Sequence, residues 1–358
     1  MRLTVLSIAF PFAPVGSGAV GGAERILSYL DEALVNAGDV SLVVACEGSR
    51  PAGKLFAVPL PEGALLDEGD RTTCVRNCQA AIDHALESYP VDVIHMHGMD
   101  VDEYVLPETI PVLMTLHLPV GWYRPAVWTS QAGRVQFCCV SQSQRRSFPL
   151  PVRDCVVVEN GVALPPAVES EPKQDFALMM GRICPEKNAH AALEAATQAG
   201  VRVVLAGQAF TYRDHQRYMH EKIEPLLKSA PRGIQHSFVG PVSLPEQQKL
   251  MAQARCLLHP TLAPETSSLV AMEALAAGTP VIAYPSGALP EIVEDGVTGF
   301  LVHNVQEMAE AICKVDTISR QACRRVAERR FNKQRMVGEY FALYEALTHQ
   351  QCGERLYA

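Results

Sequence analysis

The sequence predicts an α/β protein made of two halves, each with a doubly wound parallel β-sheet covered by helices. The chain has 358 residues, of which 48% are hydrophobic, enough to bury the cores of two domains. Short apolar runs alternate with segments of helical periodicity, which is the βαβ pattern of parallel sheets. A polar, proline-bearing passage at residues 160–173 interrupts this pattern, which then restarts.

The first half alternates strands and helices from its beginning. Apolar runs predict strands at 3–8, 41–45, 91–95, 112–116, 136–140 and 155–158. Apolar residues at helical spacing predict helices at 22–37 and 73–88. We expect this domain to span residues 1–165.

The second half repeats the same rhythm. Its patterns predict strands at 176–180, 202–206, 236–239, 256–259, 280–284 and 300–302, and helices at 188–199, 217–228 and 245–253. We expect this domain to span residues 174–336, with a last helix that is periodic over 337–348. Two such halves joined by a hinge imply a cleft, and ligands bind outside the carboxyl ends of the strands in such sheets.

Charge argues against two classes of partner. The net charge is −8, and residues 1–150 carry ten Lys and Arg against sixteen Asp and Glu. An acidic surface disfavours nucleic acid and anionic lipid headgroups. The basic run at 324–330 is expected to be a solvated helix face. No apolar run is long enough to cross a membrane, and residues 1–8 fit a first strand better than a signal peptide.

The eleven cysteines include no CxxC pair and show no metal-ligand spacing. They are scattered through apolar segments, so we expect free, buried thiols in a reducing compartment. The sequence therefore predicts a cytoplasmic protein with no bound metal and no cofactor. It leaves the oligomeric state open.

The most informative segment is 264–282, which holds two carboxylates eight residues apart. Glu265 follows a proline, and Glu273 lies within an apolar helical pattern that Ser267 or Ser268 can cap. The open amides at the helix start form an anion site. If the segment were helical throughout, the carboxylates would be about 12 Å apart, the span of a sugar and a ribose joined by a diphosphate. The ordinary alternatives are a helix-start carboxylate for Glu265 and a solvated face for Glu273.

Further polar residues follow predicted strands. A glycine-rich loop ends at Gly22, where a helix starts, and glycine amides can approach a phosphate. Arg182 and Lys187 flank a turn and can grip a diphosphate. His117 ends a strand and can hydrogen-bond or exchange a proton. The alternative for the loop before Gly22 is an ordinary surface loop, and the alternative for Arg182 and Lys187 is a solvated turn. The alternative for His117 is a structural histidine.

Two other motifs in the first half carry weaker signals. His95 and His97 end a strand, and either fits a satisfied core histidine better than a catalytic one. Asp100-Val101-Asp102 has the form of an acidic metal-binding pair, but a match of three residues arises by chance in a chain of this length. We interpret it as an acidic loop that faces an acceptor.

In their order and their places at strand ends, these motifs resemble the family 4 glycosyltransferases, which have the GT-B fold. The resemblance covers essentially the whole chain. Its carriers are Gly21-Gly22-Ala23-Glu24, Asp92-Val93-Ile94-His95, Thr115-Leu116-His117, Asn160-Gly161-Val162, Gly181-Arg182 with Glu186-Lys187-Asn188, the segment from Glu265 to Glu273, Pro290-Glu291-Ile292-Val293 and Gly296-Val297-Thr298-Gly299-Phe300-Leu301.

The resemblance implies metal-independent transfer of a hexose-type sugar from a nucleotide-diphosphate sugar, with UDP favoured over GDP and with retention at the anomeric carbon. It implies a soluble small-molecule or glycan acceptor, bound by the first domain, and a last helix (337–358) that packs back onto that domain. A nucleotide-sugar epimerase or hydrolase, a non-catalytic sugar-binding protein and a transferase fold that has lost activity are the alternatives.

The resemblance also assigns roles to residues. The implied catalytic residues are His117 and Glu265, and Glu265 with Ser267 would bind the donor sugar. Glu273 would bind the ribose. The diphosphate would be held by Gly22, Arg182, Lys187, Ser268 and Leu269. His97 and Asp100 would lie on the acceptor side.

The sequence departs from the family pattern at three places. Thr266, Ser267 and Ser268 stand where many relatives have an aromatic or small residue and a glycine. Gly287-Ala288 replaces a usual pair of glycines near the diphosphate, and Leu118 makes the segment after His117 apolar. Contacts to the sugar and to the acceptor are therefore the least constrained by the resemblance.

Overall fold

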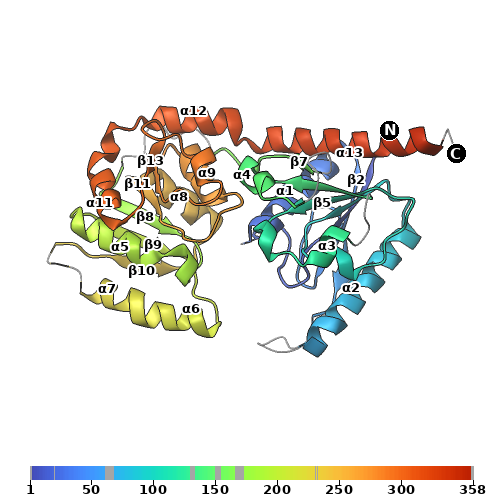
Figure 1. Ribbon diagram of the computed structural model, residues 1–358, viewed down its shortest axis with the longest axis horizontal. Helices are drawn as coiled ribbons and strands as arrows, with labels where there is room; N and C mark the ends of the chain where they lie inside the picture. The colour runs from blue at the N-terminus through green and yellow to red at the C-terminus, as the bar shows by residue number, and fades with distance from the viewer. Residues whose placement is uncertain are drawn as a thin grey trace. The chain divides into compact units, whose positions relative to one another are not determined.

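The structure is a computed structural model that describes residues 2–19, 21–60, 68–129, 134–149, 155–165, 173–229, 231 and 233–355. The chain divides into two compact units: residues 1–160 with 334–358, and residues 161–333. Each unit is a parallel sheet with helices on both faces (Figure 1). Much of the predicted interruption, residues 166–172, lies outside the described part of the chain.

The first unit holds a seven-stranded sheet in the order β3-β2-β1-β4-β5-β6-β7, in which every neighbouring pair is parallel. The chain winds outward from β1 in both directions, so the predicted doubly wound sheet is confirmed. Its strands are β1 (Thr4–Ile8), β2 (Val40–Cys46), β3 (Lys54–Val58), β4 (Val93–Met96), β5 (Val112–Leu116), β6 (Val135–Cys139) and β7 (Cys155–Val157). Strand β3 was not predicted; it lies at the sheet edge.

Helices cover both faces of this sheet, and the period of two in β2 shows how. Leu42 packs in the core with Ile82 of α2, whereas its neighbour Val43 packs on the opposite face with Leu27 of α1. The helices are α1 (Gly22–Ala37), α2 (Glu68–Ser88), α3 (Pro125–Thr129), α4 (Gln142–Arg146) and α13 (Lys333–Arg355). Residues 334–358, which contain nearly all of α13, group with this unit.

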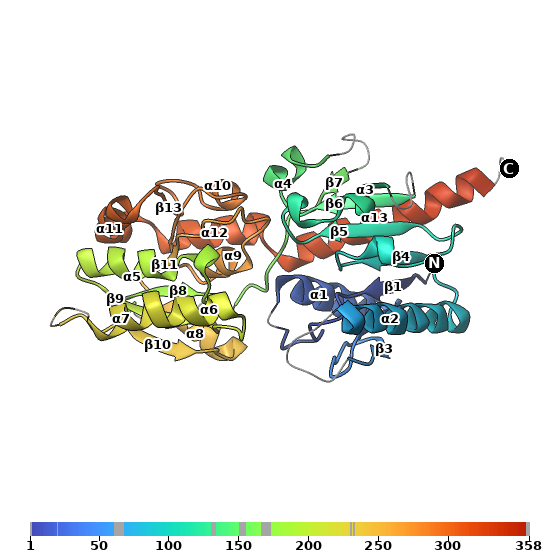
Figure 2. The same cartoon turned by 60° about the horizontal axis from the view of Figure 1, so that its bottom comes forward.

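The second unit holds a six-stranded parallel sheet in the order β10-β9-β8-β11-β12-β13 (Figure 2). The strands are β8 (Phe176–Met180), β9 (Arg202–Ala206), β10 (Ser237–Gly240), β11 (Cys256–His259), β12 (Val281–Ala283) and β13 (Gly299–Leu301). All six were predicted to within two residues.

The helices of the second unit are α5 (Ala189–Gln198), α6 (Arg213–Tyr218), α7 (Glu224–Lys228), α8 (Leu244–Gln253), α9 (Leu269–Ala276), α10 (Leu289–Ile292), α11 (Val305–Lys314) and α12 (Arg320–Arg330). The single helix predicted at 217–228 is wrong in detail: it starts earlier, as α6, and passes through a π-helical turn at Met219–Ile223 before α7. Pro225, which has no amide hydrogen, stands at the start of α7.

The described cysteines are all free, and all but the exposed Cys313 are buried, as predicted. Among the helices that the structure describes, none combines the length and the apolar character needed to span a bilayer.

Candidate functional site

The loop after β11 carries Glu265 to the start of α9. The helix begins only at Leu269, because Ser268 is extended and its Oγ accepts the Ala271 amide at 3.4 Å. Ser268 rather than Ser267 is therefore the N-cap. The separation of about 12 Å expected between the Glu265 and Glu273 carboxylates assumed a continuous helix. It does not apply, since Glu265 lies outside the helix.

Glu265 is held as a carboxylate by two cationic or polar partners. Lys187 donates to its Oε1, and His259 Nε2 lies 3.6 Å from the same oxygen. Burial raises the pKa of this carboxyl, but the contact with His259 and the charge of Lys187 lower it more, to about 2. With its side chain only 13% exposed, Glu265 is thus a buried anion with specific partners.

Three hydrogen bonds join the turn after β8 to the loop after β11. The Leu262 amide and the Thr261 hydroxyl donate to the Glu186 carbonyl at 2.8 and 3.1 Å. Asn188 Nδ2 donates to the Pro260 carbonyl at 3.1 Å. Asn188 has a left-handed φ of 56°, a conformation that asparagine tolerates better than most residues. These bonds set the position of the lysine that pairs with the glutamate.

A second loop fixes the Glu265 backbone. The Ala288 amide donates to the Glu265 carbonyl at 2.7 Å. Gly287 has a φ of 60°, and a Cβ there would lie 2.1 Å from the same carbonyl oxygen. Glycine is therefore required at position 287. At position 288, where many relatives have a second glycine, the structure accommodates alanine.

Glu273 lies on α9 and is only 9% exposed, so the solvated-face alternative is wrong. Gln247 of α8 donates from Nε2 to Glu273 Oε2 at 2.7 Å. Gln247 was not predicted as a site residue, since a glutamine on an amphipathic helix gives no signal of its own.

The other predicted residues of the second unit lie on the same two segments. Arg182 is exposed in the turn that also carries Lys187. Ser268 and Leu269 are buried at the start of α9. Ser267 Oγ is buried, and the described residues offer it no hydrogen-bond partner.

In the first unit, Gly22 is the first residue of α1. Its N-cap, Gly21, makes no side-chain capping bond, and a Cβ at Gly21 would lie 1.9 Å from the Glu24 carboxylate. Glu24 is 8% exposed, and burial raises the pKa of its carboxyl. The described part of the glycine-rich loop is also tied down, since Gly16 donates to Ser28 Oγ at 3.0 Å.

The histidines at the ends of β4 and β5 form one cluster, in which His95 and His97 are buried and His117 is partly buried. His117 Nε2 lies 3.1 Å from His97 Nδ1, and their rings stack at 13°. Burial lowers the pKa of His117 to about 4 and the pKa of His97 well below its usual value. His95 bonds Tyr344 Oη at 2.7 Å and Thr115 Oγ1 at 2.8 Å, so it is the predicted satisfied core histidine.

The acidic segment at residues 100–102 is largely buried. Asp100 is 5% exposed, and Tyr104 Oη donates to its Oδ2 at 2.5 Å. Burial raises the pKa of Asp100. Arg124 pairs with Asp102 at 2.8 Å. The acceptor-side role of His97 and Asp100 stays a prediction.

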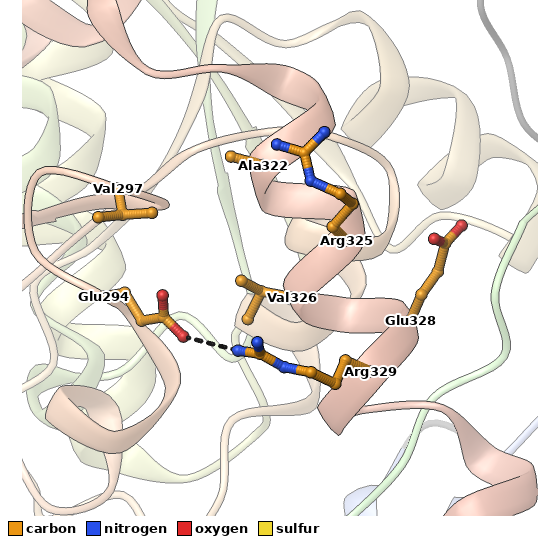
Figure 3. A pocket seen from close by; sticks show the side chains of 7 residues that line it. All are labelled: Glu294, Val297, Ala322, Arg325, Val326, Glu328 and Arg329. Atoms are coloured by element: carbon orange, nitrogen blue, oxygen red, sulfur yellow. Dashed lines mark ion pairs between the residues drawn. The ribbon is translucent and has the colours of Figure 1, made fainter.

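The basic run at 324–330 lies on α12 and is only partly a solvated face. Arg324 donates to the Pro165 and Ala276 carbonyls, and Arg330 donates to the Glu291 carbonyl. Beside these anchors is an open cavity of about 620 Å³ (Figure 3). Its lining residues are Glu294, Val297, Ala322, Arg325, Val326, Glu328 and Arg329.

Comparisons with known proteins agree with this architecture. Residues 164–330 match the family model described as Glycosyl transferases group 1. The D-inositol 3-phosphate glycosyltransferase of Mycobacterium avium is 35% identical over 142 residues, which are 39% of this chain and 32% of that protein. The chain thus spans about a third of the length of the curated relatives it matches.

Two solved structures resemble the whole chain. Sucrose-phosphate synthase from Thermosynechococcus elongatus has a TM-score of 0.79 at 19% identity, covering 98% of this chain and 100% of that one. HepE from Anabaena, in complex with UDP and glucose, has a TM-score of 0.74 at 19% identity, covering 96% and 100%. The chain therefore has the GT-B fold of two Rossmann-like units, and its second unit matches the family model Glycosyl transferases group 1.

Proposed function

We propose that the protein is a retaining glycosyltransferase that moves a hexose-type sugar from a nucleotide-diphosphate sugar to a soluble small-molecule or glycan acceptor. UDP is preferred to GDP, and no metal ion bridges the diphosphate. The observation that carries this proposal is the Glu265 carboxylate, held by Lys187 and His259 beside the start of α9. Free, buried thiols fit a cytoplasmic location.

Glu265 is suited to a donor sugar. A carboxylate with a pKa of about 2 is ionised at neutral pH and acts only as a hydrogen-bond acceptor. Sugar hydroxyls are donors, and an ionised acceptor binds them more strongly than a neutral one. Ser267 Oγ, for which the described residues supply no partner, is a second group for a sugar hydroxyl.

The turn after β8 and the start of α9 are suited to the diphosphate. Lys187 is a point charge, and Arg182 is an exposed fork for phosphate oxygens. The first amides of α9 have no acceptor within the helix and favour an anion. These groups oppose the negative charge that develops on the leaving nucleotide, so the proposed transfer needs no bridging metal.

Glu273 is suited to a ribose. It lies on α9, beyond the amides proposed for the diphosphate, and the bond from Gln247 orients its carboxylate. The UDP and glucose named for the Anabaena structure are the kind of ligand that this arrangement would bind.

The first unit is proposed to bind the acceptor. Burial keeps His117 neutral at pH 7, so it would act by hydrogen bonding or by accepting a proton rather than as a fixed cation. His97, 3.1 Å away, orients its ring. The predicted role of Gly22 at the phosphates stays a prediction.

Thermal unfolding with UDP, GDP and ADP in turn tests the donor site. A nucleotide at about 100 times its dissociation constant adds about 2.7 kcal/mol to the free energy of unfolding, so UDP should raise the melting temperature most, with or without added Mg²⁺. Lys187→Ala should abolish the shift, whereas Lys228→Ala, on an exposed pair with Glu224, should retain it. A shift by no nucleotide, or an equal shift in Lys187→Ala, would overturn the donor assignment.

Turnover then separates the transferase from its alternatives. UDP-hexoses are incubated with and without a panel of sugar and polyol acceptors, and donor and product are followed by mass spectrometry. We expect a glycosylated product that requires an acceptor and is lost in Glu265→Gln. Donor consumed equally without acceptor would indicate a hydrolase or epimerase instead.

A further inference from the structure

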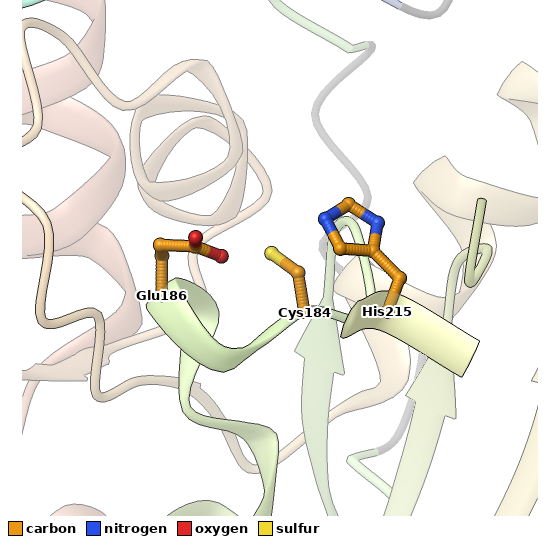
Figure 4. A group of neighbouring side chains, drawn as sticks. All are labelled: Cys184, Glu186 and His215. Carbon is orange, nitrogen blue, oxygen red and sulfur yellow. The ribbon is translucent and has the colours of Figure 1, made fainter. Parts of the chain in front are cut away.

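Three potential metal ligands gather in the second unit beside, but outside, the proposed donor-binding groups. Their Sγ, carboxylate and imidazole donor atoms all lie within 4.8 Å of one another. Figure 4 shows the Cys184 sulfur between the Glu186 carboxylate and the His215 ring, with one ring nitrogen facing the sulfur. The proposed donor chemistry uses none of these side chains.

The local fold brings the three side chains together from two elements. Cys184 and Glu186 belong to the short turn after β8, and His215 lies in α6. The two elements are in contact. Tyr212, the N-cap of α6, packs its ring edge-on against His215 with centroids 5.2 Å apart, which fixes the imidazole plane. The spacing in sequence, two residues and then 29, gave no metal motif.

His215 is 9% exposed. Its Nε2 is the ring nitrogen that faces the Cys184 sulfur in Figure 4, while its Nδ1, on the far side of the ring, is buried and finds no partner among the residues that the structure describes. Cys184 is 1% exposed, so solvent does not reach the cluster from the side of the thiol. Glu186 is exposed, so solvent reaches the cluster from the side of this carboxylate.

We propose that Cys184, His215 and Glu186 bind one Zn²⁺ ion. A thiolate, an imidazole and a carboxylate are the ligand types that zinc prefers, and the thiolate disfavours Mg²⁺ and Ca²⁺. Ligands about 2.0–2.3 Å from a tetrahedral metal lie about 3.3–3.8 Å from one another, and rotation of the exposed Glu186 side chain closes the difference. The Cys184 thiol releases its proton to solvent on binding, and water fills the fourth position.

The ion would brace the turn that carries Lys187. The Glu186 carbonyl already accepts bonds from Leu262 and Thr261, so the same turn would be tied to α6 on one side and to the loop after β11 on the other. Zinc here acts on the turn and does not contact a diphosphate. The proposal therefore stands apart from the assignment of the donor and from its metal independence.

Cobalt is the direct probe, because a Co²⁺–thiolate bond gives a near-ultraviolet charge-transfer band. The full chain is stripped with EDTA, exchanged into chelator-free buffer under reducing conditions and titrated with Co²⁺. We expect one equivalent to produce the band together with the visible bands of tetrahedral cobalt, and Zn²⁺ to displace it. Cys184→Ser should abolish the charge-transfer band, and His215→Ala should weaken metal affinity by more than about tenfold.

Two variants serve as matched controls. Cys313 is the exposed cysteine of the described chain, and His303 is an exposed histidine, so Cys313→Ser and His303→Ala should bind Co²⁺ like the wild type. Far-UV circular dichroism checks that each variant folds. Absence of the band in the wild type would overturn the proposal, and so would a band that persists in Cys184→Ser or is lost in Cys313→Ser.

Discussion

Glu265→Gln is expected to remove a pH-dependent part of the stability of the chain. Burial raises the pKa of the Glu265 carboxyl, and His259 and Lys187 lower it more, from 4.5 to about 2. A carboxyl whose pKa is lower in the folded than in the unfolded state adds stability above the unfolded value, and this stability is lost as the pH falls toward the folded value. A difference of about 2.5 units, at 1.36 kcal/mol each, amounts to roughly 3 kcal/mol.

The assay is urea unfolding, followed by far-UV circular dichroism, at intervals from neutral pH down to about pH 3. The other carboxyls contribute equally to the wild type and to Glu265→Gln. The difference between the two proteins in the pH dependence of the free energy of unfolding therefore reports on Glu265 alone. The wild type should lose about 2 kcal/mol more than Glu265→Gln between about pH 4.5 and 3. Glu221→Gln, which breaks only an exposed pair with Arg217, should change stability by less than about 1 kcal/mol. An equal pH dependence in wild type and Glu265→Gln would refute the reasoning.

Three further predictions concern other parts of the molecule. Tyr344→Phe removes the partner of buried His95 Nδ1 and should lower the free energy of unfolding by about 1–3 kcal/mol, measured by thermal melting. Gly287→Ala places a Cβ 2.1 Å from the Glu265 carbonyl oxygen at a φ of 60°, and should cost about 2 kcal/mol or more and weaken nucleotide binding, measured by calorimetry. Burial lowers the pKa of His117 to about 4, so wild-type stability should fall as the pH drops from about 6.5 to 4, and His117→Gln should flatten this slope in urea titrations.

Each of these has a matched control. Tyr29→Phe alters a tyrosine that is only partly buried and should shift the melting temperature less than Tyr344→Phe. Gly121→Ala adds a Cβ with nothing described within 4 Å and should be nearly neutral. His220→Gln, on an exposed helix position, should keep the wild-type slope. Equal effects in a variant and its control would contradict the corresponding prediction.

The fold was largely predictable because several central strands are buried at every position. Residues 176–180 are an uninterrupted apolar run and residues 112–116 are apolar except for Thr115, and the structure gives strands with these bounds. Strand β3 escaped prediction because it is an edge strand with exposed and buried residues along only five positions. The π-helical turn between α6 and α7 was not predicted, because π-helical turns are rare and carry no sequence pattern of their own.

The candidate site was predictable only in part. Glu273 stood out as a charge within an apolar helix, and Lys187 as a cation after a buried strand. Their partners did not: Gln247 is 26 residues from Glu273, and Lys187 is 78 residues from Glu265. Such pairs arise from the order of strands in the sheet, and no local pattern marks them. The burial of Asp100 likewise had no local signal in the sequence.

The path of the chain through the two units has a consequence for synthesis. The ends of the second unit are joined to each other: the Val162 amide donates to the Phe331 carbonyl at 2.7 Å, and the Lys333 amide donates to the Val162 carbonyl at 3.0 Å. The first unit, by contrast, is completed only by residues 334–358, whose Tyr340 and Tyr344 are fully buried. On the ribosome, residues 1–160 therefore wait for residues 334–358 before their unit is complete, while the second unit can fold as soon as residue 333 has left the exit tunnel. A nascent chain stalled near residue 334 would therefore contain a folded second unit joined to an incomplete first unit.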